Sequence, residues 1–348
     1  MKPEAKKYQV AVGDKTLVFE TGRLAAQAGG AVTVGSGEAL ILGVATMDKE
    51  PREGIDFLPL TVDYEERMYA GGSIPGSFFR REGRPSEGAI LIDRLTDRPL
   101  RPLFPKDLRN PIQVIMYSFS ADAETPLDIL AINAASAAVT ISDIPWDGPV
   151  GAVRIGMIEG QFVVNPTYAE MEVSALDLRI AGTRDAVLMV ECGANELSEE
   201  KIIAAVEFGH QAMQPIITTL DQMAVEVGKA KSAYPSFKLD EQIKAAVMAR
   251  AAAPLEDLLG QDLAKADAKE ALQTLKAEII AEFTAEDDTI KGDVKEAFDL
   301  AHKAVVRSRI LDKGIRPDGR DFTTVRPIWC DVGTSPRAHR RTEICAGS

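Results

Sequence analysis

The sequence has 348 residues, is 45% hydrophobic and carries a formal net charge of −13 at pH 7. This composition excludes a globally disordered chain, and the length favours two or three domains with packed cores. The acidic charge excludes polyanion binding over the whole surface but allows a local basic patch, since charges act over only about 10 Å at cellular salt.

The sequence shows no pattern typical of membrane insertion, secretion or metal binding. No run of about 18 apolar residues occurs, and the first residues, MKPEAKKYQV, lack the apolar region of a signal peptide. The cysteines lack C-x-x-C spacing, and the histidines are scattered, so we predict no disulfide framework or zinc site and expect a reducing cytoplasm. These residues are Cys192, Cys330, Cys345, His210, His302 and His339.

The first part of the chain predicts a β-sheet. Residues 8–63 alternate short apolar runs with glycine, proline and aspartate, as strands and turns do. Within them, Val32–Val34, the turn sequence GSG and Ala39–Ala45 predict a hairpin. The segment GGAVTVGSG matches neither a P-loop nor a G-x-G-x-x-G turn that opens a helix, so we interpret its glycines as hairpin turns.

A helix follows over residues 86–98, where apolar residues recur at helical spacing. Ser86 is its predicted N-cap, and Pro99 and Pro102 are predicted to end it.

After a predicted strand over 111–120, the segment TPLDILAINAASAAVTIS is small and apolar. It predicts a helix that packs closely on a sheet, capped by Thr125 and with Pro126 in the first helical position. The acidic residues just before it, Asp122 and Glu124, are interpreted as caps rather than metal ligands.

Residues 149–164 and 173–193 predict four further strands. The nearly continuous apolar run over 185–193 is typical of a central strand. Residues 197–227 predict one long amphipathic helix.

The composition changes near residue 235. Residues 239–312 are rich in Ala, Glu, Lys, Leu and Asp and predict a separate bundle of three or four helices. From residue 314 turn residues return, and Asp318-Gly319-Arg320 repeats an acid–glycine–arginine step seen near residue 20. This repeat suggests that a second copy of the first fold begins near Ile315.

The segment GSFFRREGRP places two aromatic rings beside three arginines in an acidic protein. Guanidinium groups suit phosphates, and each base stacked on a ring contributes about 1–3 kcal/mol. The alternative is a surface loop with its phenylalanines in the core and its arginines solvated. The candidate residues are Phe78, Phe79, Arg80, Arg81 and Arg84.

The following segment, DRLTDRPLRPLFP, adds arginines at helical spacing and brings the total to six arginines in 22 residues. We interpret Arg94, Arg98 and Arg101 as weaker candidates for the same anion. The alternative is a structural ion-pair network with the nearby acids, which are Glu82, Glu87, Asp93 and Asp97.

These two segments, with TPLDILAINAASAAVTISDIPWDGPVGAVRIG and GIRPDGRD, closely resemble the bacterial polynucleotide phosphorylase (polyribonucleotide nucleotidyltransferase) family. The resemblance runs from about residue 8 to about 335. It implies an α+β fold, in which an RNase PH-like domain (ribosomal protein S5 domain 2-like βαβα) is followed by an all-α helical domain. The implied parts are 8–146 and 147–232 for the RNase PH-like domain, 236–313 for the helical domain and 314–348 for the truncated start of a second RNase PH-like domain.

The resemblance also implies an activity. Members of the family degrade single-stranded RNA from its 3′ end in mRNA degradation: inorganic phosphate attacks the terminal phosphodiester and releases nucleoside diphosphates. Mg²⁺ assists, and homotrimeric rings thread RNA through a channel. The resemblance assigns RNA binding to the arginine-rich segments, and thus to Phe78, Phe79, Arg80, Arg81 and Arg84, with Arg94, Arg98 and Arg101 less strongly.

The family's phosphate-binding turn, Mg²⁺ ligands and catalytic aspartates lie in the second RNase PH-like domain, which this sequence does not reach. Its tail, TSPRAHRRTEICAGS, keeps Pro336, Arg337 and His339 but then leaves the family pattern. We therefore assign no catalytic or metal residue and expect the chain to be inactive alone. A non-catalytic RNA-binding or assembly module and a small-molecule phosphotransferase remain as alternatives.

Overall fold

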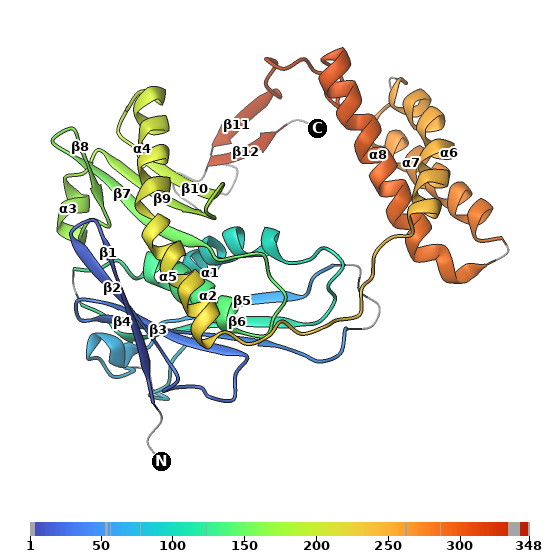
Figure 1. Ribbon diagram of the computed structural model, residues 1–348. Coiled ribbons are helices and arrows are strands. Elements are labelled where there is room, and N and C mark those ends of the chain that lie inside the picture. The colour runs from blue at the N-terminus through green and yellow to red at the C-terminus, as the bar shows by residue number, and fades with distance from the viewer. Residues whose placement is uncertain are drawn as a thin grey trace. The chain divides into compact units, whose positions relative to one another are not determined.

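The computed structural model describes residues 4–52, 55, 57–76, 78–122, 124–261, 263–285, 287–332 and 342–346. It divides into two compact units, Met1–Phe237 and Lys238–Ser348 (Figure 1). Most of the tail that departs from the family pattern, with Pro336, Arg337 and His339, lies outside the described residues. In the part of the chain that is described, no helix combines the length and apolar composition needed to cross a membrane.

The first unit begins with a six-stranded sheet in the order β1-β2-β3-β4-β6-β5. Neighbouring strands are antiparallel except for the parallel pair β5 and β6. The predicted hairpin is confirmed as β3–β4, where Ser36 pairs with Ala39 and Gly37 takes a φ of 59° in the turn. The strands are β1 Lys6–Val12, β2 Lys15–Thr21, β3 Gly30–Ser36, β4 Ala39–Met47, β5 Leu60–Glu65 and β6 Ile112–Ser120.

A second, four-stranded antiparallel sheet has the order β10-β9-β7-β8, which confirms the four strands predicted between residues 149 and 193. The expectation of a central strand over 185–193 is wrong, because β10 is an edge strand whose outer residues are exposed. Its apolar run faces partly outward, with Val190 39% exposed. The strands are β7 Gly151–Ile158, β8 Gln161–Val164, β9 Leu176–Gly182 and β10 Val187–Ala194.

Helix α2, Leu127–Ile141, is buried along its length and packs on strands of both sheets. Small residues allow this, since a Cβ at Gly30 would lie 2.0 Å from the Ala138 carbonyl oxygen. The buried Asn133 side chain exchanges two hydrogen bonds of 3.0 Å with the backbone of Ala152 on β7. The predicted cap is wrong: Pro126, with a ψ of 126°, is itself the N-cap.

Two other helices of this unit differ from the sequence predictions. Helix α1, Glu87–Leu100, is capped by Ser86 as predicted, but it includes Pro99 in its last turn and ends two residues later than expected. The single helix expected over 197–227 is two helices, α4 Glu199–Ala212 and α5 Gln214–Val227. Pro215 has no N–H for the carbonyl four residues earlier, which accounts for the break at Met213. A short helix, α3 Tyr168–Glu172, completes the set.

The segment after α5 stays attached to the first unit. The Lys231 ammonium donates to the carbonyls of Thr140 and Ser142 at 3.1 and 2.8 Å, at the C-terminal end of α2. Further along, Tyr234 and Ser236 donate to the carboxylate of Asp107. These bonds explain why the first unit ends at Phe237 rather than at the end of α5.

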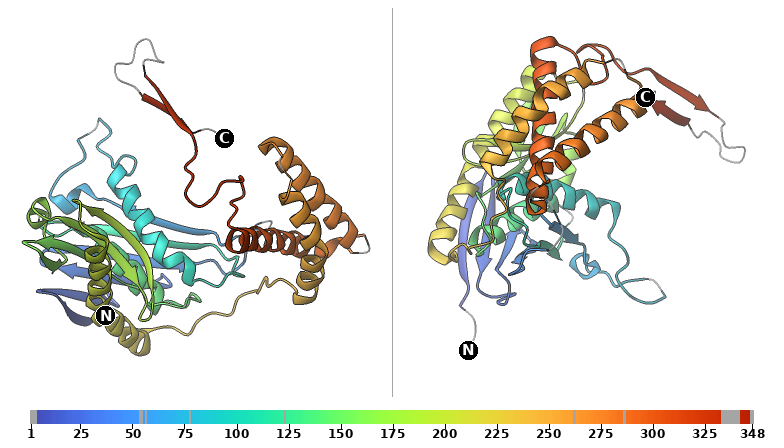
Figure 2. Two further views of the ribbon diagram at one scale, coloured as in Figure 1. Left: turned by 90° about the horizontal axis from the view of Figure 1, so that it is seen from above. Right: turned by 90° about the vertical axis from the view of Figure 1, so that its right-hand side faces the viewer.

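The described residues of the second unit form a bundle of three α-helices, within the predicted range of three or four. Figure 2 shows these helices side by side. They are α6 Glu241–Leu259, α7 Lys265–Phe283 and α8 Lys291–Lys313. Val247, Leu255, Ile279 and Phe298 belong to their common core. The unit also holds the hairpin β11 Ile328–Val332 and β12 Thr342–Ala346.

A buried ion network joins the start of α2 to β7 and β9. Arg154, 7% exposed, donates two hydrogen bonds of 2.7 and 2.8 Å to Asp177. Arg179 donates to Asp128 at 2.6 Å, and 3.7 Å separates Arg154 from the same carboxylate. Two arginines and two aspartates balance, so the network leaves no net charge to attract an anion.

We expect Arg154→Met to lower the free energy of unfolding by about 3 kcal/mol, because it leaves the carboxylates of Asp128 and Asp177 to share the single positive charge of Arg179. Urea denaturation measures the change. Arg98→Met, which breaks a solvent-exposed pair with Glu191, is the matched control and is expected to cost about 0–1 kcal/mol. Equal losses in the two variants would contradict a structural role for the buried network.

Candidate nucleic-acid interface

The arginine-rich loop starts from a fixed base. A 3-10 helix, Met68–Gly71, is tied to the end of β6, because Ala121 N–H donates to the Ala70 carbonyl at 2.9 Å. Just before it, Arg67 N–H donates to the Ser118 hydroxyl at 3.0 Å. Gly72 ends the turn with a φ of 71°, a conformation that favours glycine. The chain therefore leaves β5 and enters the loop along a defined path.

The tip of the loop points both aromatic rings into solvent. Phe78 is 94% exposed and Phe79 is 81% exposed, so neither side chain belongs to the core. The two rings meet edge to face, with centroids 5.3 Å apart and planes at 83°. A core position for the phenylalanines, which was the alternative interpretation of this segment, is therefore wrong.

The three arginines of the loop are exposed. Arg80, Arg81 and Arg84 make no hydrogen bond or ion pair with any described residue. Arg80 also has a φ of 46°, in the left-handed region that is uncommon for arginine. The loop thus presents three full positive charges beside two uncovered rings.

The carboxylates of this loop are occupied by groups other than arginine. Glu82 Oε1 accepts the backbone N–H of Met68 at 3.1 Å. Glu66 Oε2 accepts the Ser86 hydroxyl at 2.6 Å, while the same Ser86 oxygen accepts Ala89 N–H and caps α1. These contacts close the loop at two points, and no carboxylate that the structure describes neutralises its guanidinium groups.

The arginines of α1 and of the turn after it differ from one another in whether a carboxylate pairs with them. Arg94 is exposed and makes no hydrogen bond or ion pair with the described residues. Arg98 pairs with Glu191 at 2.9 Å, and Arg101 makes a two-pronged pair with Asp97 at 2.8 and 2.9 Å. Among the described residues, the alternative interpretation, an ion-pair network within this segment, is met only by Asp97 and Arg101.

Asp93, on the face of α1 toward β5, has an unusual environment. Burial raises its pKa from 3.8 to about 6, with smaller contributions in the same direction from Asp63 and Glu65. A hydrogen bond from the Tyr64 backbone acts in the opposite sense. Its Oδ1 is buried and, among the described residues, accepts no hydrogen bond.

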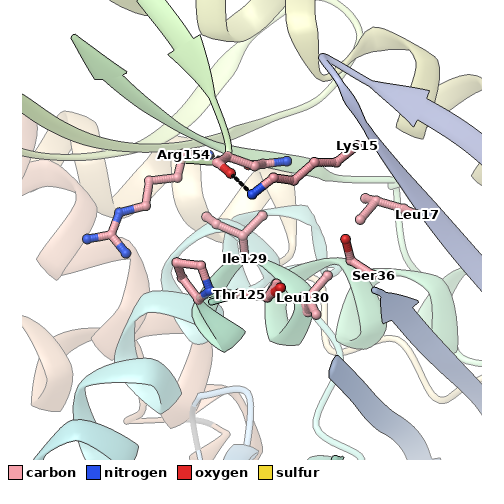
Figure 3. Close-up of a pocket in the computed structure, with 9 residues that line it drawn as sticks. Lys15, Leu17, Ser36, Thr125, Ile129, Leu130 and Arg154 are labelled. Carbon is pink, nitrogen blue, oxygen red and sulfur yellow. Dashed lines mark hydrogen bonds between the residues drawn. The ribbon is translucent and has the colours of Figure 1, made fainter. Parts of the chain in front are cut away.

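A pocket at the start of α2 is a second place where a ligand could be sought (Figure 3). Its volume of about 20 Å³ has room for about one water molecule. Figure 3 shows that Arg154 extends away from Lys15, whose ammonium donates to the Asn165 carbonyl at 2.6 Å. This pocket is too small for a nucleotide.

The open hollow of about 450 Å³ beside this pocket is lined by more acids than bases. It contains Lys15 together with Glu38, Asp122 and Glu124. Although burial acts to raise the pKa of Asp122, hydrogen bonds from Thr125 and Glu124 lower it overall, so the carboxylate stays charged at neutral pH. The hollow therefore repels phosphate.

The described residues do not suit a bound Mg²⁺ ion. They contain no cluster of three or more acidic, cysteine or histidine side chains in a position to hold a metal. The carboxylates of Asp128, which is buried, and Asp177, which is partly exposed, are paired with Arg179 and Arg154.

Comparison with protein families gives three matches in chain order. The 3′ exoribonuclease family, domain 1, matches residues 14–145, and domain 2 of the same family matches residues 148–212. The RNA binding domain of polyribonucleotide nucleotidyltransferase matches residues 242–321. These matches confirm the predicted α+β RNase PH-like domain followed by a helical domain.

Similar proteins agree with this order. The polyribonucleotide nucleotidyltransferases of Koribacter versatilis, Dehalococcoides mccartyi and Chloroflexus aggregans are 44%, 45% and 48% identical over 97%, 96% and 94% of this chain. The chain belongs to the polyribonucleotide nucleotidyltransferase family. It spans less than half the length of these relatives, namely 42%, 46% and 44%. The crystal structure of rice (Oryza sativa) Rrp46 matches 64% of this chain and 96% of its own, with 15% identity and a TM-score of 0.49.

Sequence reasoning about this family member missed two kinds of residue in the loop. It overlooked the closing contacts of Glu66 and Glu82, which depend on side-chain geometry. It also overlooked the exposure of Tyr69 and Ile74, which are 56% and 81% exposed. Two large apolar residues in a glycine-rich loop were the available signal for an interaction surface.

We expect Asp93→Asn to raise the thermal midpoint at pH 7.5 and to have little effect at pH 4. The folded-state pKa is raised, so stability is lost as the pH rises from about 4 through about 6, and the amide removes this loss. Solvent screening limits the gain to about 1 kcal/mol. Thermal melts across this range measure it, with the exposed Glu207→Gln as control. A gain that did not depend on pH would contradict the explanation.

Proposed function

We propose that these 348 residues form the RNA-holding part of a phosphorolytic 3′-to-5′ exoribonuclease that acts in mRNA degradation. The observation that carries the proposal is the loop tip, where Phe78 and Phe79 are exposed beside three guanidinium groups that pair with no residue in the described part of the chain. The proposed ligand is the backbone and bases of single-stranded RNA.

The chemistry of the loop fits a single strand better than a folded ligand. Guanidinium groups bind phosphate oxygens in any nucleotide sequence, and every base has a face that can stack on a ring. Bases are accessible for stacking only when they are unpaired. We therefore propose binding with little sequence preference, centred on Phe78 to Arg84, with Arg94 as a further contact. Arg98 and Arg101 contribute less, because carboxylates already neutralise them.

Family membership supports the rest of the proposal. We propose that 8–146 and 147–232 form the first RNase PH-like domain, that 236–313 form the helical domain and that 314–348 begin a second RNase PH-like domain. In the complete enzyme, inorganic phosphate attacks the terminal phosphodiester with the help of Mg²⁺ and releases nucleoside diphosphates. We propose a homotrimer and a cytoplasmic location, where its mRNA substrate is found.

The charges in this chain support a separation of RNA binding from phosphorolysis within the enzyme. Asp128 and Asp177 are paired with arginines, which makes them poor ligands for Mg²⁺, and the acidic hollow beside α2 repels phosphate. We propose that phosphorolysis needs residues beyond these 348. The same observations leave a non-catalytic RNA-binding or assembly module as the second candidate function. They disfavour a small-molecule phosphotransferase.

We expect the double variant Arg80→Ala, Arg81→Ala to bind single-stranded RNA at least about 10-fold more weakly. Two lost phosphate contacts also make the salt dependence shallower, by about 0.7 in log–log slope for each contact. Fluorescence anisotropy with a labelled oligo(A) at several salt concentrations measures both quantities. The control is Arg184→Ala with Arg250→Ala, which removes the same charge from surface ion pairs. Unchanged affinity in the first variant would remove the loop from the RNA-binding surface.

We expect the purified chain, incubated with poly(A), inorganic phosphate and Mg²⁺, to release no nucleoside diphosphates. Chromatography of the products measures this. Sustained release would show that the described residues carry phosphorolysis, against the proposal.

A further inference from the structure

We propose that Glu82 is a positioning residue of the RNA-binding loop, assisted by Glu66, and that its acceptor oxygen, not its charge, is what RNA binding needs. The inference rests on the proposed function of the loop. It concerns how an acidic side chain contributes to a surface that binds a polyanion.

The hydrogen bond between Glu82 and Met68 joins the two ends of the loop. Met68 is the first residue of the 3-10 helix, and the N–H groups at the start of a helix have no partner within it. Arg67, the N-cap, provides no side-chain hydrogen bond. Glu82 Oε1 reaches back across 14 residues to accept Met68 N–H at 3.1 Å. The loop tip therefore lies inside a ring whose base is the 3-10 helix tied to β6.

Glu82 lies beside arginines in the sequence but bonds to the Met68 backbone instead. It follows Arg81 directly and precedes Arg84 by two residues, yet among the described residues neither arginine pairs with it. Because its carboxylate is occupied by Met68, it holds the tip without neutralising the guanidinium groups beside it. A carboxylate that paired with Arg81 would remove the charge that the strand requires.

Glu66 closes the loop at its other end in the same manner. Its Oε2 accepts the Ser86 hydroxyl at 2.6 Å, and Ser86 in turn accepts Ala89 N–H at the start of α1. The end of the loop and the start of α1 are therefore fixed to the residue that precedes Arg67. The two contacts fix the chain near both ends of the loop. They therefore limit the positions that the arginines of the tip can take, namely Arg80, Arg81 and Arg84.

Loss of the Glu82 charge and loss of its hydrogen bond are expected to change RNA affinity in opposite directions. Two variants of Glu82 distinguish these two effects. Removing a negative charge strengthens binding to RNA if electrostatics alone matters, and Glu82→Gln and Glu82→Ala remove the same charge. Only glutamine keeps an oxygen that can accept Met68 N–H. We expect Glu82→Gln to bind oligo(A) at least as tightly as the unchanged chain. We expect Glu82→Ala to bind about fivefold more weakly than Glu82→Gln. Equal or tighter binding by Glu82→Ala would overturn the proposal.

A readout independent of RNA accompanies the affinities. Trypsin cleaves after arginine, so we expect cleavage at Arg80 and Arg81 to be faster in Glu82→Ala and unchanged in Glu82→Gln. The contact is exposed, so we expect the thermal midpoint of both variants to stay within about 2 °C of the unchanged chain. Equal cleavage rates would show that Glu82 does not position the tip, and a large fall in midpoint would assign it a general structural role.

The Arg80→Ala, Arg81→Ala variant, measured in the same assay, distinguishes this proposal from the one on which it rests. If that variant binds RNA normally, the proposed function of the loop is wrong whatever Glu82 does. If it binds weakly while both Glu82 variants bind alike, the loop holds RNA and only the positioning role is wrong.

Discussion

The close approach of α2 to the six-stranded sheet is the constraint on which the first unit depends. At Gly43 an added Cβ would lie 2.5 Å from the Ala134 carbonyl oxygen, so backbone touches backbone without an intervening side chain. The same helix bonds to β7 through Asn133, which joins the two sheets at one element. This packing fixes β4 and, through its pairing, β6. The base of the arginine-rich loop is attached to the end of β6, so the core determines where the loop leaves the protein.

The loop combines a fixed base with an exposed tip, and the allocation of carboxylates makes this possible. In an acidic protein most arginines find a carboxylate nearby, as Arg154, Arg179 and Arg101 do. Around the loop, Glu66 and Glu82 are occupied by a hydroxyl and a backbone N–H instead. A local positive surface thus exists on a chain of net charge −13 because of hydrogen bonding, not because acids are missing from the segment.

Local patterns predicted most of the elements, while features decided by distant contacts escaped them. The alternation of the strands, the small residues of α2 and the change to a helical bundle are properties of neighbouring residues, and they were visible in the sequence. The edge position of β10 depends on which strands pair, so its apolar run was misleading. Pro99 lies in the last turn of α1, whereas Pro215 lies at the start of α5 and divided a predicted helix, and the local sequence did not distinguish these two positions.

The same distinction applies to the candidate site. Arginine and phenylalanine content identified the loop, because the chemistry of guanidinium groups and rings does not depend on the fold. Which arginines remain unpaired does depend on it, since Arg98 meets Glu191 from a strand 93 positions away in sequence. The eight residues named from the sequence therefore divide by their contacts. The arginines of the tip pair with none of the described residues. Under the proposed function, Arg98 and Arg101 exchange a carboxylate for a phosphate, which reduces their gain from binding.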